Sequence, residues 1–228
     1  MNGTGLTILW AVHSLAAVLE PAWTTTTQPP NGHFTARVIG QEYCGATPND
    51  ITASLFLTIE VQLRNEGTRP IIVAREPGPP MVSRVARSLE DAARGIFAAE
   101  LAWEEAYTES EANRIPRVRL GSAPDPSQFV VLSHGGTYKW KVTTAVVVAR
   151  QGTGPIPGTV PAGSEYLLQV EVPLWPFRLT PPDEMRDPST RWLTHGELFV
   201  GSDTTEFLAF RADVFATLPA CESRPGKS

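Results

Sequence analysis

The stretch ASLFLTIEVQLRNEGTRPIIVA, residues 53–74, decides the fold class of this chain of 228 residues. Apolar and polar side chains alternate along its first half, which is the period of a β-strand with one buried face. The apolar positions are Leu55, Leu57, Ile59, Val61 and Leu63. The residues NEGT (65–68) predict a turn, and Pro70 is tolerated at the first position of a second strand over RPIIVA (69–74).

Two later stretches have the same period of two residues. In FVVLSHGGTYKWKVTTAVVVA (129–149), Gly135 and Gly136 predict a hairpin turn between strands. In GTVPAGSEYLLQVEVPLW (158–175), a turn containing Pro and Gly precedes another strand. The positions expected to share one face are Tyr138, Trp140, Val142, Thr144, Val146, Val148, Tyr166, Leu168, Val170, Val172 and Leu174. The segment 196–221 predicts one or two last strands.

The run RVARSLEDAARGIFAAELAW (84–103) permits two interpretations. Its alanines and leucines suit one continuous helix. We favour a strand, a short helix and a second strand, because Ser88 is a good N-cap with Asp91 three residues later and Gly95 is typical of the position after a helix end. The strands would then lie over 81–87 and 96–103.

Together these elements predict an all-β fold, an antiparallel β-sandwich of about nine strands with one short helix. The 21 prolines and 18 glycines suit many turns, and a hydrophobic fraction of 42% is ample for a core. We expect a single domain over residues 35–222, a flexible lead-in over 23–34 and a tail over 223–228.

The N-terminal segment predicts export. Residues 6–19 are largely apolar over the length of a signal-peptide core and fall short of the roughly 20 residues that a membrane span needs. We therefore expect residues 1–22 to be a signal peptide, the protein to be secreted or periplasmic, and no stable membrane span. No Lys or Arg precedes Arg37, which is unusual for a signal, and the alternative is a buried N-terminal helix or strand.

The chain has two cysteines, Cys44 and Cys221. In an exported protein such a pair predicts a disulfide. The bridge would tie the first strand to the segment after the last one, and closing so long a loop stabilises a fold by about 4–5 kcal/mol at most in the chain-entropy account. The net charge of −5 and the lack of a Lys or Arg run disfavour nucleic acid and anionic membranes as partners.

Few side chains point to catalysis or to a metal. Ser133 and His134 are adjacent, but neighbouring strand residues face opposite sides and no G-x-S-x-G is present, so we interpret them as a polar turn. The histidines are scattered and no C-x-x-C occurs, so we expect no metal and no cofactor. QGTGPIPG (151–158) echoes a phosphate-binding loop, but its prolines and the lack of a following helix indicate a plain connection.

Three features remain as candidates for function. The acidic loop 104–111 could supply the paired carboxylates of a hydrolase, although such runs are usually solvated; its acids are Glu104, Glu105, Glu109 and Glu111. Trp175 and Phe177 stand between prolines and are candidate binding residues for sugar or protein. The long connections 104–126, 150–163 and 176–195 are where we expect recognition to lie.

The order of these motifs resembles two families. LTIEVQLRNEGTRPIIV (57–73), FVVLSHGGTYKWKV (129–142), VPAGSEYLLQVEV (160–172), GELFV (196–200) and TEFLAFRADVF (205–215), followed by a last Cys, resemble the exported bacterial immunoglobulin-like sandwich proteins. The strand and turn signature also resembles the bacterial intracellular proteinase inhibitor family. The resemblance implies an immunoglobulin-like fold, without the Cys, Trp, Cys core of antibody domains.

We therefore expect an exported, non-enzymatic, immunoglobulin-like interaction module with a protein or carbohydrate partner. The alternatives are a proteinase inhibitor and a hydrolase that uses the acidic loop.

Overall fold

The computed structural model of the chain describes residues 32–45, 50–75, 78, 80–102, 121–174, 190–199, 201–215 and 217–221. In these ranges it has twelve β-strands and one short α-helix, so the predicted all-β class is confirmed. The strand count exceeds the predicted nine because the last third of the chain forms several very short strands. These are β8 (Val160–Pro161), β10 (Glu197–Leu198), β11 (Ser202–Thr204) and β12 (Leu208–Ala212).

The first sheet is built on two long strands. β2 (Thr52–Asn65) pairs along its whole length with β7 (Thr137–Ala149), and the strand order is β1-β2-β7-β8. The alternation predicted for β2 is confirmed, because each of its inward apolar side chains is at most 2% exposed. β1 (Gly32–Cys44) begins inside the predicted lead-in, so residues 32–34 are strand. Its register against β2 shifts between Val38 and Gly40.

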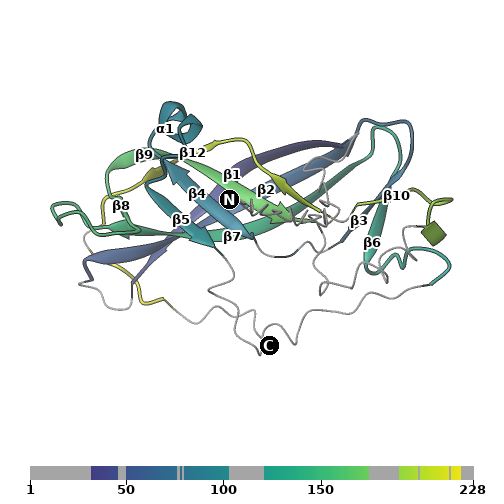
Figure 1. The fold of residues 1–228 in the computed structure, drawn as a ribbon. Helices are drawn as coiled ribbons and strands as arrows, with labels where there is room; N and C mark the ends of the chain where they lie inside the picture. The colour runs from purple at the N-terminus through teal and green to yellow at the C-terminus, as the bar shows by residue number, and fades with distance from the viewer. Residues whose placement is uncertain are drawn as a thin grey trace, which may run out of the picture.

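The second sheet has the order β11-β9-β4-β5, and β12 also pairs with β9. Its central strands are β9 (Ser164–Pro173) and β4 (Val82–Ala86), and β5 (Ala99–Ala102) lies at one edge. A third, small sheet contains β3 (Ile71–Ala74) between β10 and β6 (Phe129–Leu132). Figure 1 shows the small sheet at one end of the molecule and β8 at the other.

One apolar core joins the first two sheets. It contains inward side chains of β2 and β7 from the first sheet and of β4, β9 and β12 from the second. Across this core, the hydroxyl groups of Ser83 on β4 and Thr144 on β7 lie 2.6 Å apart. The two sheets therefore pack face to face. A separate apolar cluster lies at the small sheet and consists of Ile72, Ala74, Phe129 and Trp192.

The expectation of a purely antiparallel fold is wrong in two places. β8 runs parallel to β7 and β10 runs parallel to β3. After β7 the chain must reverse its direction twice before β8 begins. β8 therefore runs in the same direction as β7 and pairs with its last residues.

The turn at Gly135 and Gly136 is present, but it does not close a hairpin. β6 pairs with β3, whereas β7 pairs with β2, so this turn carries the chain from the small sheet to the first sheet. Gly135 has a φ of 72°, and its N–H donates to Asn65 O, while Asn65 N–H donates to Gly136 O. A side chain at Gly136 would meet Ser133 O at 2.9 Å. The turn is therefore fixed against the end of β2.

The short helix is confirmed and the continuous helix over 84–103 is wrong. α1 (Leu89–Ala93) has Ser88 as its N-cap, whose Oγ accepts a hydrogen bond of 3.0 Å from Asp91 N. Gly95 follows the helix with a φ of 70°. Strands β4 and β5 flank it, as the cap and stop residues predict.

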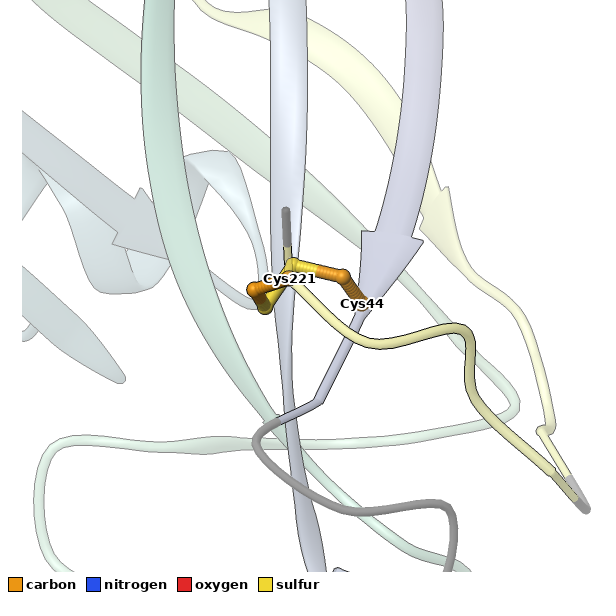
Figure 2. The surroundings of a disulfide bond; sticks show 2 residues. All are labelled: Cys44 and Cys221. Atoms are coloured by element: carbon orange, nitrogen blue, oxygen red, sulfur yellow. A yellow bond between two sulfur atoms is a disulfide. The ribbon is translucent and has the colours of Figure 1, made fainter. Parts of the chain in front are cut away.

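The predicted disulfide between Cys44 and Cys221 is present, with a Cα to Cα distance of 4.8 Å. Figure 2 shows Cys44 at the end of β1 and Cys221 on the chain segment that crosses beside it. This segment follows β12, so the bridge joins the first strand to the segment after the last one, as expected.

Candidate functional site

A pocket with a volume of about 460 Å³ lies where β7 and β8 meet. It is at the same end of the sandwich as the disulfide, because Cys44 pairs with Ser54 near the start of β2 and Thr52 pairs with Ala149 at the end of β7. The connection 150–159 forms most of its wall, and the other lining residues are Arg87, Ala98, Ala149, Pro161 and Ala162. We call this cavity the arginine pocket.

The wall of the arginine pocket is ordered by its own hydrogen bonds. Thr153 Oγ1 donates to Arg150 O at 2.5 Å, and Thr159 Oγ1 donates to Ile156 O at 2.9 Å. Each threonine thus closes a tight turn, and the turns contain Gly152 and Gly158 with φ of 84° and 72°. Because these turns are closed within the loop itself, the pocket exists before any ligand enters.

Arg150 is held in place by an aromatic stack. Its guanidinium lies 5.6 Å from the centre of the Phe215 ring, a cation–π geometry. Phe215 in turn lies 6.1 Å from the ring centre of Tyr43, and the Tyr43 hydroxyl accepts a 2.6 Å hydrogen bond from Asp213 N. Burial raises the pKa of Tyr43 above its ordinary value of 10.0, so the phenol stays neutral.

The segment that carries Phe215 is anchored to β1. We call residues 213–215 and 217–221 the C-terminal strap. Gly45 N donates to Pro219 O at 3.0 Å, Cys221 N donates to Gly45 O at 2.9 Å, and the disulfide closes the same contact (Figure 2). The bridge therefore fixes the strap, the strap fixes Phe215, and Phe215 supports Arg150.

Two arginines, Arg87 and Arg150, line the arginine pocket, and none of its described lining residues is acidic. Guanidinium groups recognise carboxylate and phosphate through paired N–H donors. The rest of the described wall mixes both kinds of residue: Ile156 stands between Pro155 and Pro157, and Gln151, Thr153 and Thr159 are polar. The arrangement suits a ligand that has an anionic group and an apolar body.

The residues predicted from the sequence have different outcomes. Trp175 and Phe177 lie outside the described residues, and so does the acidic loop 104–111. Of the three connections predicted for recognition, 150–163 is fully described and contributes most of the arginine pocket. The other two are described only from residue 121 and from residue 190 onward.

The adjacent Ser133 and His134 lie in the turn before β7. His134 Nδ1 is 3.0 Å from Gly67 O, so the imidazole joins two turns at the small sheet. In the described ranges, no three His, Cys, Asp or Glu side chains gather as metal ligands would.

The two arginines were not predicted from the sequence. The interpretation of QGTGPIPG (151–158) as a plain connection is incomplete, because no helix follows it but its residues line the arginine pocket. Arg150 directly follows an apolar strand and Arg87 precedes a helix cap, which is a weak local signal. Arg87 follows β4 and Arg150 follows β7, so the two residues meet at one pocket because the sheets that contain these strands face each other.

No helix in the described part of the chain has the length and apolar character that crossing a membrane requires. Comparison of the chain with protein-family models, with curated proteins and with solved structures finds no match.

Proposed function

We propose that this protein is an exported, non-enzymatic binding module on an immunoglobulin-like β-sandwich, and that the arginine pocket binds a carboxylate ligand. The observation that carries the proposal is the pair Arg87 and Arg150 in one preformed cavity whose described lining has no acid. The disulfide supports export, because such bridges persist in oxidising compartments. The two facing sheets support the sandwich.

The pocket favours binding over chemistry. Its described lining includes two arginines, two threonines and loop glycines, and arginine can hold an anion without activating a nucleophile. The support of Arg150 by Phe215 keeps one cation in position, which lowers the ordering cost of binding. Arg87 is exposed and would close on the ligand from the rim.

The test is a titration of the full chain, with its disulfide intact, against benzoate and citrate, with benzamide as the uncharged control. We expect the carboxylates to raise the thermal midpoint and benzamide to leave it unchanged. Arg150→Gln and Arg87→Gln should each remove the shift. Arg69→Gln, an exposed arginine at the opposite end of the sandwich, is the matched control and should retain it. Equal shifts with benzamide, or no loss in the Arg150 variant, would contradict the proposal.

A further inference from the structure

The outer side of the first sheet concentrates positive charge. Toward the Gly32 end of β1, strand pairing places nine outward residues of β1, β2 and β7 in three rows, whereas nearer Cys44 the same side carries the acid Glu42. The rows are His33 with Arg64 and Thr137, Thr35 with Gln62 and Lys139, and Arg37 with Glu60 and Lys141. Four of the nine carry a permanent positive charge and one carries a negative charge, in a chain whose net charge is −5. We call these nine residues the basic face.

Glu60 lies among the cations and neutralises only part of their charge. Its Oε1 is 2.7 Å from Arg37 Nη2 and 3.6 Å from Lys139 Nζ. The hydrogen bond from Arg37 is the main reason that the pKa of Glu60 lies below its ordinary value of 4.5, so the carboxylate stays ionised. Lys141 and Arg64 are exposed, and neither forms an ion pair with another described residue. A surplus of positive charge therefore faces solvent.

The opposite sheet does not share this character. On the outer side of β4, β5, β9 and β12, Arg84 pairs with Glu100 at 3.4 Å, and Arg211 lies opposite Glu165 in the strand register. Glu171 on β9 adds a further carboxylate and accepts a hydrogen bond from Ser202. Acidic and basic groups thus nearly balance there, and the positive surplus is specific to the first sheet.

The shape and composition of the basic face suit a linear polyanion. Same-face neighbours are about 7 Å apart along a strand and about 5 Å apart between strands, so the cations form a regular flat array. A shallow hollow of about 280 Å³ lies within it, lined by Arg37, Gln62 and Lys139 among others. Thr35 and Thr137 add hydroxyl groups that can bond sugar hydroxyls. The rows contain no aromatic anchor, whereas protein interfaces are built around such anchors.

We propose that the basic face binds an acidic polysaccharide, a chain of sugars that carry carboxylate or sulfate groups. This surface is separate from the arginine pocket, because it shares none of the pocket's lining residues. Binding would rest on several exposed charge contacts at once, so it would weaken as salt rises.

The experiment measures affinity of the full oxidised chain for polygalacturonate and for dextran sulfate, with uncharged dextran as the control polymer. We expect binding to at least one of the charged polymers and none to dextran, with the affinity falling steadily between low and physiological salt. Binding to polygalacturonate alone or to dextran sulfate alone would tell whether carboxylate or sulfate is preferred. An affinity for uncharged dextran equal to that for the charged polymers would overturn the proposal.

Matched variants separate this surface from general charge effects. The double variant Arg64→Gln with Lys141→Gln should weaken binding by roughly five- to tenfold, and Glu60→Gln should tighten it. The double variant Arg84→Gln with Arg211→Gln, which removes two cations from the opposite sheet, should bind as the wild type does. Arg150→Gln should also leave polymer binding unchanged, which distinguishes this surface from the pocket.

All these side chains are exposed or partly exposed, so the variants should fold, and circular dichroism and the thermal midpoint check this. Equal losses in the two double variants, or binding to vesicles of anionic lipid with none to either charged polymer, would refute the assignment.

Discussion

Different interactions stabilise the two ends of the sandwich. At one end the disulfide and the C-terminal strap hold the end of β1 beside the arginine pocket. At the other end the small sheet is held by packing and by one buried amide. Asn65 Nδ2 donates to Arg69 O and to Leu132 O, both at 2.8 Å, and its Oδ1 accepts from Gly67 N.

The apolar part of that far end is centred on Trp192, which is fully buried. Its ring meets Phe129 edge to face at 5.1 Å, and its Nε1 donates to Gly121 O at 2.9 Å. A reducing agent can therefore loosen only the end that carries the arginine pocket, since the other end contains no disulfide among its described residues. Long strands β2 and β7 connect the ends.

The largest expected effect is at the far end. Trp192→Ala should lower the free energy of unfolding by about 3–5 kcal/mol, because it leaves a cavity beside Phe129 and removes the hydrogen bond to Gly121. Urea unfolding measures the loss. Carboxylate binding at the arginine pocket should persist below the unfolding transition. If the pocket lost affinity together with the small sheet, the ends would not be independent.

A smaller effect is expected from opening the disulfide. The double variant Cys44→Ala with Cys221→Ala should lose about 2–4 kcal/mol of stability, since the unfolded chain is no longer cross-linked over 177 residues. Hydrogen exchange should speed up in the strap and in 150–159 and stay unchanged in β3 and β6. Benzoate affinity should fall as Phe215 loses its anchor. Uniform acceleration at both ends would contradict the comparison.

The buried carboxyl group of Asp203, toward the far end of the second sheet, should make the stability of the fold depend on pH. It is 3% exposed, its Oδ2 has no hydrogen-bond partner, and burial raises its pKa from 3.8 to about 6. Between these two values the folded state holds a proton that the unfolded state releases, so stability falls as the pH rises through this window.

Asp203→Asn removes that charge and keeps the acceptor for Thr204 N. At pH 7.5 it should raise the free energy of unfolding by about 1–3 kcal/mol, and near pH 3.5 the gain should vanish. Urea unfolding at both pH values checks this, with Asp213→Asn, an exposed aspartate, as the control. A gain of the same size at both pH values would show that the charge is not the cause.

The smallest effect concerns the helix cap next to the pocket rim. Ser88→Ala removes the acceptor of the Asp91 N–H and should cost about 1 kcal/mol, whereas Ser88→Thr should cost less. Because Arg87 precedes the cap, we expect a slight loss of benzoate affinity in the alanine variant. A larger loss of affinity in the threonine variant than in the alanine variant would argue against this link.

Local features of the fold could be predicted from the sequence. The alternation of β2, the cap at Ser88 and the glycine after α1 each depend on residues close in the chain, and each is confirmed. The pairing of Cys44 with Cys221 followed from there being only two thiols.

Features that depend on distant pairings could not be predicted. The glycine turn before β7 has the composition of a hairpin, yet β6 pairs with β3, and the buried amide of Asn65 donates to Leu132 O at the end of β6. Short parallel strands such as β8 have too few residues for a periodic pattern. Arg87 and Arg150 share a pocket only because the two sheets face each other, which no spacing in the sequence encodes.

The register shift in β1 decides which atoms reach the disulfide end. Before it, Phe34 and Val38 stand opposite Leu63 and Ile59 and point inward; after it, Tyr43 takes the inward position opposite Leu55. Ile39 is the additional residue of this bulge. Inward-facing residues of β1 therefore have even numbers before it and odd numbers after it. If β1 paired with β2 without this bulge, Ile39 would stand opposite Thr58 and Tyr43 opposite Ser54, so the phenol would turn outward and Cys44 would face the core. The bulge in β1 is thus a condition for the disulfide to form.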